Sequence, residues 1–296
     1  MELSILVVDQ HLEKYYQDYL RRKRMIGKIY VMGDIHGSFK PIRDFHLRHN
    51  TNKEYNEADK TMILLGDAGL NFFFNHRDEE FKKKLGKYPF TYFVVRGNHE
   101  ERPSICAEKN PDKWHQEPMW GWSVWVENDY PYIKYAMDYV TMYFIPYKDE
   151  ENERSMPSIA KTLVIPGAYS VDKYKRLQAG WSWFPQEQLS ESEKLAGKSL
   201  IDAFGWNCDL VLSHTCPIIY EPTDLFLPVV DQSMVEKDME RYLGEIEYKL
   251  DYKAWMWGHY HQFRDYPRAD ERYRTMLFND AALDLCEYME GEVNKL

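Results

Sequence analysis

The chain has 296 residues, of which 44% are hydrophobic and 16% aromatic, and its 38 basic and 48 acidic residues give a formal net charge of -10. This acidic balance opposes the phosphate-tracking surface of a duplex nucleic-acid binder, so that class is not expected. No stretch approaches the ~20 apolar residues of a membrane span, and four cysteines without a C-x-x-C pair do not make a disulfide scaffold. We therefore expect a cytoplasmic protein with no membrane contact.

The first predicted element is a polar helix over residues 9–25 that ends in the basic cluster Arg21-Arg22-Lys23-Arg24. Cations are favourable at the C-terminus of a helix, so a solvated helix end explains the cluster, and a contact with nucleic acid or a membrane is the alternative. Because no repeat or Pro/Gly/Ser-rich linker follows, we expect a single domain over residues 1–296, with residues 1–26 as an N-terminal helical appendage.

Short apolar runs rich in β-branched and aromatic residues recur along the rest of the chain, which is typical of buried strands. Polar stretches with helical composition, 78–87 and 187–204, lie between some of them. This alternation predicts an α/β sheet protein. The expected strands are Ile29–Met32, Met62–Leu65, Tyr92–Val95, Leu163–Ile165, Leu210–Leu212, Trp255–Trp257 and Met276–Phe278.

Metal-ligand side chains follow five of these runs directly, and nearly every one stands next to a glycine. In open α/β sheets, ligands bind beyond the carboxyl ends of the strands, so we expect these side chains to meet at one sheet edge. The glycines let the backbone turn sharply at these positions. The residues are Asp34 and His36, then Asp67, then Asn98 and His99, then His214, and finally His259 and His261.

Carboxylates, an amide and imidazoles together suit Mn²⁺, Fe or Zn²⁺ rather than a Ca²⁺ cage, and we favour Mn²⁺. The side chains of Asp34 and His36 project from the same turn and can bind a first metal ion. His261 can bind that same ion. Asp67 is the candidate bridge to a second ion. Two ions about 3.5–4 Å apart can generate a bridging hydroxide and hold a phosphate for in-line attack. Asn98, His214 and His259 can complete the coordination of the second ion.

His99 directly follows Asn98, so it is expected beside the metal ions without binding either of them. A general acid that protonates the leaving oxygen belongs in that position. The alternative is a structural role, in which His99 orients Asn98 or caps a loop.

Together these segments resemble the calcineurin-like metallophosphoesterases, over residues ~28 to ~280. The matching residues are Asp34-x-His36, Gly66-Asp67, Gly97-Asn98-His99-Glu100, His214 and Gly258-His259-Tyr260-His261. The resemblance implies a four-layer αββα sandwich of two mixed β-sheets flanked by helices, with the metal site at the carboxyl ends of the strands. It implies His99 as the catalytic acid. It implies Asp34, His36, Asp67 and His261 on the first metal ion, and Asp67, Asn98, His214 and His259 on the second.

The second segment departs from the Ser/Thr protein phosphatases of this family, in which Gly-Asp is followed by a further Asp and an Arg. Here the corresponding stretch is Ala68-Gly69-Leu70-Asn71. The acid that would orient the catalytic histidine and the arginine that would grip phosphate are missing there. A protein phosphatase therefore becomes an alternative, and a general phosphoesterase becomes the leading hypothesis.

An aromatic-rich insert at about residues 101–160 separates the third and fourth segments. Its rings suit either a packed β-hairpin layer or a platform for a nucleobase. Core packing is the simpler interpretation, but stacking would favour a nucleotide substrate. The rings belong to Trp114, Trp120, Trp122, Trp125, Tyr130, Tyr132, Tyr135, Tyr139, Tyr143 and Phe144.

Arg102, Lys173 and Arg176 are candidate phosphate contacts, because a cation beside the metal ions would balance developing negative charge. Ordinary surface charge is the alternative for each of them. The sequence thus predicts a phosphoric ester hydrolase for mono- or diesters, with small-molecule or nucleotide substrates favoured. A non-catalytic binding scaffold with this fold and a single-strand nuclease are further alternatives, and the oligomeric state stays open.

Overall fold

We analysed the protein in a computed structural model, which describes residues 27–49, 60–148, 158–266 and 270–296. The helix expected over residues 9–25 lies outside the described residues. The described strands are β1 (Ile29–Met32), β2 (Lys60–Leu65), β3 (Phe90–Val95), β4 (Trp114–Met119), β5 (Trp122–Glu127), β6 (Ile133–Tyr135), β7 (Thr141–Lys148), β8 (Ser158–Ile165), β9 (Leu210–Ser213), β10 (Ala254–Trp257), β11 (Arg264–Asp265), β12 (Tyr273–Met276) and β13 (Ala282–Asp284). The helices are α2 (Lys40–His49), α3 (His76–Leu85), α4 (Pro103–Lys109), α5 (Lys173–Ala179), α6 (Glu191–Ala203), α7 (Asp238–Lys249) and α8 (Leu285–Glu290).

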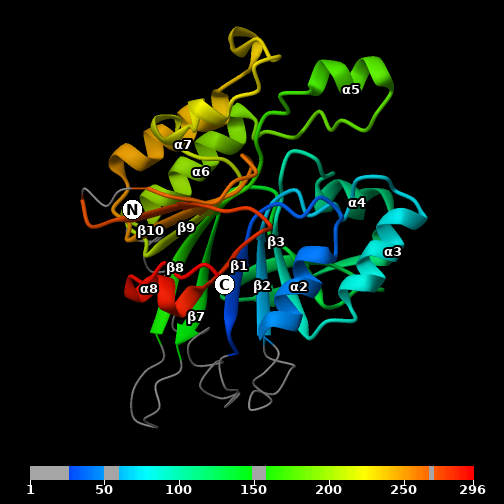
Figure 1. Cartoon of the computed structure of the whole chain (residues 1–296), viewed down its shortest axis with the longest axis horizontal. Helices are drawn as coiled ribbons and strands as arrows, with labels where there is room; N and C mark the ends of the chain where they lie inside the picture. Colours follow the sequence, from blue (N-terminus) through cyan, green and yellow to red (C-terminus); the bar gives the residue numbers. More distant parts are fainter. Residues whose placement is uncertain (1–26, 50–59, 149–157, 267–269) are drawn as a thin grey trace.

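Two mixed β-sheets lie at the centre of the molecule (Figure 1). The seven-stranded sheet has the order β13-β1-β2-β3-β6-β5-β4, and β1, β2, β3 and β6 run parallel in it. The six-stranded sheet has the order β11-β12-β10-β9-β8-β7, and β12, β10, β9 and β8 run parallel in it. Each sheet also has antiparallel pairs, such as β13 with β1 and β7 with β8.

Helices cover the outer face of each sheet, which produces three separate layers of apolar packing. Between the sheets, Val31 and Phe93 of one sheet pack in the same cluster as Leu212 and Met256 of the other. Outside the seven-stranded sheet, residues of β1 to β3 pack against α2, α3 and α4. Outside the six-stranded sheet, residues of β8 to β10 pack against α6 and α7. The four-layer αββα sandwich expected from the sequence is therefore confirmed.

The apolar runs are continuous because both faces of the parallel strands are covered. In β1, Val31 faces the other sheet, whereas Tyr30 and Met32 face the helices. Since alternate residues of a strand point to opposite faces, a strand buried on both sides needs apolar residues at every position. This requirement made the parallel strands recognisable in the sequence.

The helix expected over residues 187–204 begins four residues later than predicted. Ser190 accepts a hydrogen bond from the backbone N–H of Glu193, and the Glu193 side chain accepts one from the Ser190 N–H. This capping box fixes the start of α6 at Glu191. Glu187 therefore lies in the preceding loop, where its carboxylate can bond to side chains near the metal-site loops.

The aromatic insert contributes β4, β5 and β6 to the seven-stranded sheet and β7 to the other. Strands β4 and β5 pair antiparallel as a hairpin, and Trp120 and Tyr143 contact Phe93 between the sheets. Trp114 and Tyr135 are buried on the helix side. These contacts favour core packing over a nucleobase platform. Within the described part of the chain, no helix is both long and apolar enough to cross a membrane.

Candidate metal centre

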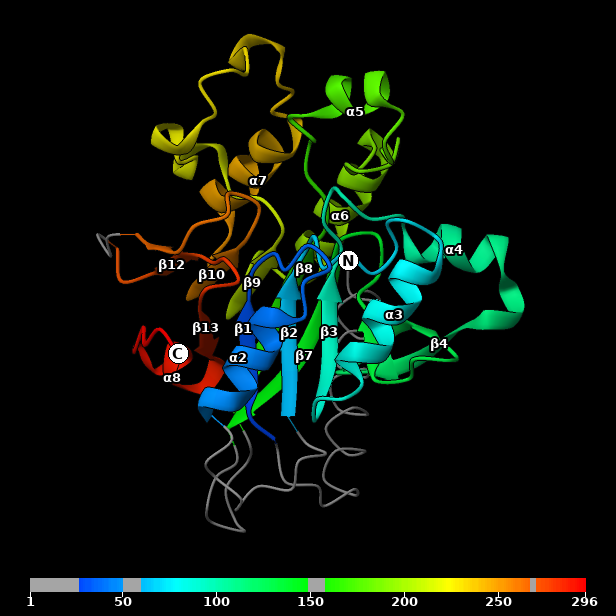
Figure 2. The same ribbon diagram turned by 45° about the vertical axis from the view of Figure 1, so that its right-hand side comes forward.

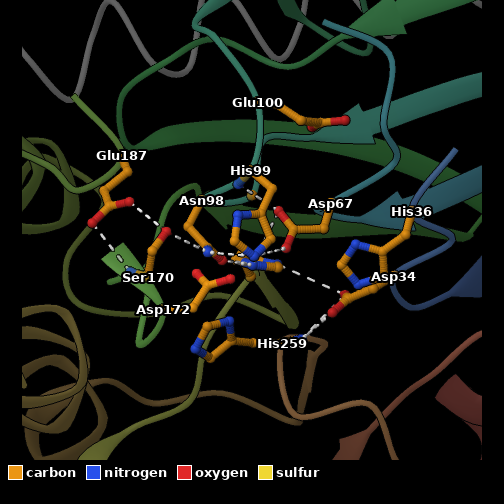
Figure 3. Close-up of polar contacts among 12 residues, drawn as sticks. Asp34, His36, Asp67, Asn98, His99, Glu100, Ser170, Asp172, Glu187 and His259 are labelled. Carbon is orange, nitrogen blue, oxygen red and sulfur yellow. Dashed lines mark hydrogen bonds and ion pairs between the residues drawn. The ribbon is translucent and has the colours of Figure 1, made fainter. Parts of the chain in front are cut away.

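The loops that follow β1, β2 and β3 meet the loops that follow β9 and β10 above one edge of the sandwich (Figure 2). Asp34 follows β1, Asp67 follows β2 and Asn98 follows β3. His214 follows β9 and His259 follows β10, so the other sheet supplies imidazoles to the same place. Figure 3 shows the side chains of these labelled residues directed toward a common centre: Asp34, His36, Asp67, Asn98, His99 and His259.

Asp34, His36 and His261 form one group of ligand-type atoms, which all lie within 4.8 Å of one another. The Nε2 atoms of His36 and His261 are 2.8 Å apart, and His261 Nε2 is 3.4 Å from Asp34 Oδ2. The Asp34 carboxylate also accepts hydrogen bonds from the backbone N–H of His259. Three of the four side chains predicted for the first metal ion are thus close together, and Asp67 is not part of this group.

Asp34, Asp67 and His214 form a second group within the same limit, and all three are buried. His214 Nε2 lies 3.7 Å from Asp67 Oδ1 and 2.8 Å from Asn98 Oδ1. The His259 ring lies beside His214, with 5.0 Å between the ring centroids. Asp34 is the residue that the two groups share, and Asp67 contributes its carboxylate to the second group. The bridging role expected of Asp67 stays a prediction.

His214 Nε2 and Asn98 Oδ1 face each other as two lone-pair atoms, an arrangement that suits a shared divalent cation. His214 Nδ1 is 2.7 Å from the Leu65 carbonyl oxygen, which can only accept, so Nδ1 carries the proton and Nε2 presents a lone pair. Asn98 donates its Nδ2 to Ser170 Oγ, so its Oδ1 also presents a lone pair. Two acceptors that face each other need a cation between them. Their 2.8 Å separation matches neighbouring ligands of one ion, which lie roughly 3 Å apart when each bond is about 2.1 Å.

Four of the proposed ligands have left-handed backbone conformations: His36 (φ 45°), Asp67 (φ 43°), His259 (φ 71°) and His261 (φ 54°). This region is uncommon for residues other than glycine and costs on the order of 1–3 kcal/mol per residue, so it persists only where the surroundings enforce it. Such strain is concentrated at functional sites, and here it is concentrated in the ligand loops.

The neighbouring glycines leave room for the ligands. A Cβ atom at Gly66 would lie 2.0 Å from His214 Nδ1, and one at Gly97 would lie 2.0 Å from Asp67 Oδ1. Both distances are far inside van der Waals contact. The glycines found beside the motifs are thus required by close approach of the ligand side chains, and Gly66 additionally has φ 93°.

The electrostatics of the centre favour the protonation states in which these side chains bind metal ions. Burial alone would raise the pKa of Asp67, but the adjacent His99, His214 and His36 outweigh it and hold that pKa below its usual range. Burial, with His214 next in importance, lowers the pKa of His259 well below its usual value. A carboxylate and a neutral imidazole are the forms that bind metal ions.

His99 lies at the rim of the centre and is approached by a cation. Its Nε2 atom is 3.8 Å from Asp67 Oδ2, 3.2 Å from Asn98 Nδ2 and 3.4 Å from Arg176 Nη2. Burial is the main cause of a lowered His99 pKa; Arg176 also lowers it and Asp67 opposes the shift. Arg176 is in turn held by Asp172, whose Oδ1 lies 2.7 Å from Arg176 Nε. Arg176 of α5 thus brings to His99 the kind of cation that is missing from residues 68–71, and Asp172 contacts that cation.

The other two predicted phosphate contacts lie elsewhere. Arg102 is buried, and its guanidinium donates to the Glu193 carboxylate and to the carbonyl oxygens of Gln186 and Gln188. These hydrogen bonds connect Arg102, at the N-terminus of α4, to residues 186–193. Arg102 therefore does not face the metal centre. Lys173 Nζ lies over the rings of Trp183 and Tyr169, at 4.7 and 5.4 Å from their centroids. Among the three candidates, Arg176 alone lines the cleft that opens from the metal centre.

A buried chain of polar residues behind Asn98 was not foreseen from the sequence. Ser170 Oγ accepts from Asn98 Nδ2 at 2.9 Å and donates to Glu187 Oε2 at 2.5 Å (Figure 3). Glu187 also accepts from the Ser170 backbone N–H and from Trp183 Nε1. Arg96 Nη1 holds the Glu187 carbonyl oxygen. The only signal in the sequence was the position of Ser170 shortly after a predicted strand.

The centre opens into a cleft of about 440 Å³, within the usual range of ligand sites. His36, Asp67, Asn98, His99, His259 and His261 line one end, and mostly apolar residues line the other. None of the aromatic residues named for the insert is among the lining residues of this cleft.

Comparisons with known proteins place this geometry in context. Among solved structures, the chain is similar to the protein TT1561 of Thermus thermophilus (10% identity, 92% of this chain and 99% of that chain covered, TM-score 0.49). It is also similar to a phosphopantetheinyl hydrolase of Mycobacterium tuberculosis (14%, 86% and 90%, TM-score 0.41) and to a dimetal phosphatase of Danio rerio (11%, 86% and 88%, TM-score 0.41). No curated protein sequence matches the chain.

A sequence model of the calcineurin-like phosphoesterases matches residues 27–263. That span covers most of the chain and contains all seven proposed ligands together with His99. The chain therefore belongs to the calcineurin-like phosphoesterase family.

Proposed function

We propose that the protein is a metal-dependent hydrolase of small phosphoesters, with His99 as the general acid and two divalent cations, Mn²⁺ favoured, as cofactors. The observation that carries this proposal is the pair of facing acceptors, His214 Nε2 and Asn98 Oδ1, beside the Asp67 carboxylate. Their arrangement is unfavourable without a cation and suits a transition-metal ion. When bound, two such ions supply Lewis-acid charge and lower the pKa of a coordinated water.

The proposed part of His99 is to deliver a proton from Nε2 to the leaving oxygen. Burial, as the main cause, lowers the pKa of His99 and so favours the neutral ring. A phosphoester dianion beside Nε2 raises the pKa of the imidazole, because the opposite charge favours the protonated form. Arg176 Nη2, 3.4 Å from the same nitrogen, is placed to bind a phosphoryl oxygen.

Small esters are favoured over protein substrates by the residues that follow Asp67. Gly69 and Leu70 donate their backbone N–H groups to Glu100, and Asn71 accepts from Lys82. This stretch is therefore engaged in packing its own loop and offers no phosphate-binding cation. Because none of the rings named for the insert lines the cleft, the main reason for preferring a nucleotide is removed, although a nucleotide remains within the proposed class.

Replacement of His99 by Ala tests the proposal with two substrates of different leaving group. We expect kcat for an alkyl phosphate to fall by about 10²–10⁴-fold and kcat for p-nitrophenyl phosphate to fall much less, because nitrophenolate leaves without a proton. The bound metal, measured by mass spectrometry, should stay unchanged. Equal losses for both substrates, or unchanged turnover of the alkyl ester, would remove His99 from the role of acid.

A further inference from the structure

The cleft continues from the metal centre into an end whose walls are mostly apolar. The wall is formed by the segment 225–235, which comes between β9 and α7, together with Tyr169, Val171 and Tyr260. In Figure 2 this segment and the loop that carries α5 both stand on the same side of the sheets as the metal-site loops. The apolar side chains of the segment that line the cleft are Leu225, Phe226, Leu227, Val230 and Val235.

These side chains face the cleft without an apolar partner that would cover them fully. Leu227 is 55% exposed, and Val230 and Val235 are partly exposed. Large apolar side chains gathered at a cleft are a mark of ligand binding, because their hydration is unfavourable until something covers them. The substrate must therefore bring apolar surface to this end.

Four polar residues of this region also line the cleft, Gln232, Glu236, Lys237 and Glu240, and only Glu240 among them is buried. Glu240 of α7 is only 3% exposed, yet it is a lining residue of the cleft. Its Oε1 atom accepts a hydrogen bond of 2.7 Å from Thr215 Oγ1, whereas its Oε2 atom has no partner among the described residues. The nearby Lys237 does not supply one, because its ammonium pairs with Glu221 Oε1 at 2.7 Å. A buried acceptor without a donor raises the free energy of the folded protein, so a ligand that donates a hydrogen bond to Oε2 would be favoured.

A nucleobase is a poor match to this end of the cleft. Phe226 is the aromatic residue of the segment on which a base could stack. Lys237 Nζ, however, already lies 4.4 Å from the centroid of its ring. The Tyr260 hydroxyl is directed to Thr215 and Cys216, and its ring packs edge-on against His259. The other apolar residues of the segment that line the cleft, Leu225, Leu227, Val230 and Val235, are aliphatic, which suits a flexible chain better than a flat heterocycle.

We propose that this end of the cleft is a substrate subsite for the apolar alkyl or acyl chain of a phosphoester, and that the chain carries one hydroxyl or amide N–H that donates to Glu240 Oε2. The inference rests on the proposed phosphoesterase function, because the subsite is continuous with the metal centre. It assigns the substrate to amphiphilic phosphoesters, and it makes Glu240 a specificity-determining residue with no part in bond cleavage.

Binding of alkylphosphonates, which the enzyme cannot hydrolyse, tests the subsite separately from catalysis. We expect the Kd of the Mn²⁺-loaded protein to fall about two- to fourfold for each methylene added between ethyl- and octylphosphonate. The Val230→Asp variant should lose this dependence, and Leu47→Asp, at a 66% exposed position on α2 remote from the cleft, should keep it. Thermal unfolding of both variants checks that they are folded.

A hydroxyl moved along the octyl chain tests the part of Glu240. At one position it should lower the Kd by about tenfold. The Glu240→Gln variant keeps an oxygen for Thr215 but presents an amide N–H to the cleft, so it should lose that gain while it still binds plain octylphosphonate. A hydroxyl that helps at no position overturns the assignment of Glu240.

Two outcomes separate this inference from the proposed function. If octyl- and ethylphosphonate bind equally while p-nitrophenyl phosphate is hydrolysed, the subsite is wrong and the phosphoesterase stands. If chain length matters for binding but neither p-nitrophenyl phosphate nor octyl phosphate is hydrolysed, the subsite stands and the proposed activity is wrong.

Discussion

His214 Nδ1 lies 2.7 Å from the carbonyl oxygen of Leu65, and this contact links a strand end of one sheet to a strand end of the other. Leu65 is the last residue of β2, and His214 follows the last residue of β9. Because the carbonyl oxygen can only accept, the contact fixes the tautomer of the imidazole and points Nε2 toward Asn98 and Asp67. Packing of the sandwich thereby prepares one ligand of the proposed second metal ion.

Replacement of His214 by Ala should therefore remove one of the two bound metal ions and lower phosphoesterase turnover at least 100-fold, because the second ion loses a ligand and its oriented lone pair. Metal content by mass spectrometry, together with p-nitrophenyl phosphate turnover, measures both effects. His115→Ala is the matched control, since His115 lies on the exposed hairpin and bonds Asn128. Two retained equivalents in His214→Ala would contradict the assignment.

Glu187 should act on metal affinity through Asn98 without touching a metal ion. Its carboxylate holds Ser170, which holds the Asn98 amide with its oxygen toward the metal centre. In Glu187→Gln one acceptor becomes a donor and the chain of hydrogen bonds is broken, so we expect a 10- to 100-fold weaker second metal site. Mn²⁺ titration measures the loss. Glu191→Gln, which replaces an exposed carboxylate that pairs with Lys194, should bind Mn²⁺ as the wild type does.

The sequence predicted the ligand loops because each depends on local information: an apolar run ends, a glycine follows, and a ligand-type residue comes next. It gave no comparable signal for Glu187, which reaches Ser170 from 17 residues away and Asn98 from still farther along the chain. Tertiary contacts of this kind depend on how loops pack against one another, and the hydrophobic pattern of the sequence carries no information about loop packing.

The same reason explains the uneven outcome for the predicted cations. Arg102, Lys173 and Arg176 all stand in suitable loops, but only the packed structure shows that Glu193 engages Arg102 and aromatic rings lie under Lys173. Six of the seven expected strands lie within strands of the structure, because continuous apolarity is what a doubly covered strand requires, whereas Met276–Phe278 shares only Met276 with β12. The start of α6 differs from the prediction because the capping box at Ser190 sets it.

Gly97 should be intolerant of the smallest substitution. A Cβ atom there would lie 2.0 Å from Asp67 Oδ1 and 2.4 Å from the Asp67 backbone nitrogen, so Gly97→Ala must displace the proposed bridging ligand. We expect both metal ions to bind at least tenfold more weakly in a folded protein. Gly244→Ala is the control for steric strain away from the metal centre, because its added atom would lie 2.9 Å from the Ile218 methyl Cγ2 and near no proposed ligand. Normal metal affinity in Gly97→Ala would show that Asp67 does not bridge.

Arg176 should affect substrate capture and His99 together. Replacement by Gln removes the charge 3.4 Å from His99 Nε2, so the phosphoryl group loses a contact of about 1.5–3 kcal/mol and kcat/KM should fall roughly 10- to 100-fold. Metal content should not change, since Arg176 contacts none of the proposed ligands through the hydrogen bonds described. Lys175→Gln, at an exposed position on the same helix, is the control. Unchanged kinetics in Arg176→Gln would remove it from the site.

Acid stability should depend on Asp270 and Arg274, at a distance from the cleft. The Arg274 guanidinium donates to both Asp270 oxygens, at 2.8 and 2.7 Å, and this hydrogen bonding lowers the pKa of Asp270 to about 2. Because a carboxyl in an unfolded chain titrates near 3.9, the stabilisation is fully present above about pH 4 and is lost as the pH falls toward 2. Asp270 is half exposed, so solvent screening limits the effect to about 1 kcal/mol or less.

The free energy of unfolding of wild type and Asp270→Asn, measured by urea titration at pH 6 and pH 3, tests this dependence. The difference between the two proteins should be larger at pH 6 than at pH 3, because at pH 3 protonation of the wild-type carboxyl has begun in the unfolded chain. Asp280→Asn, which breaks an exposed pair with Lys295, is the control for loss of one surface charge. A difference that does not shrink in acid would mean that the Asp270 carboxylate is not held by Arg274 in solution.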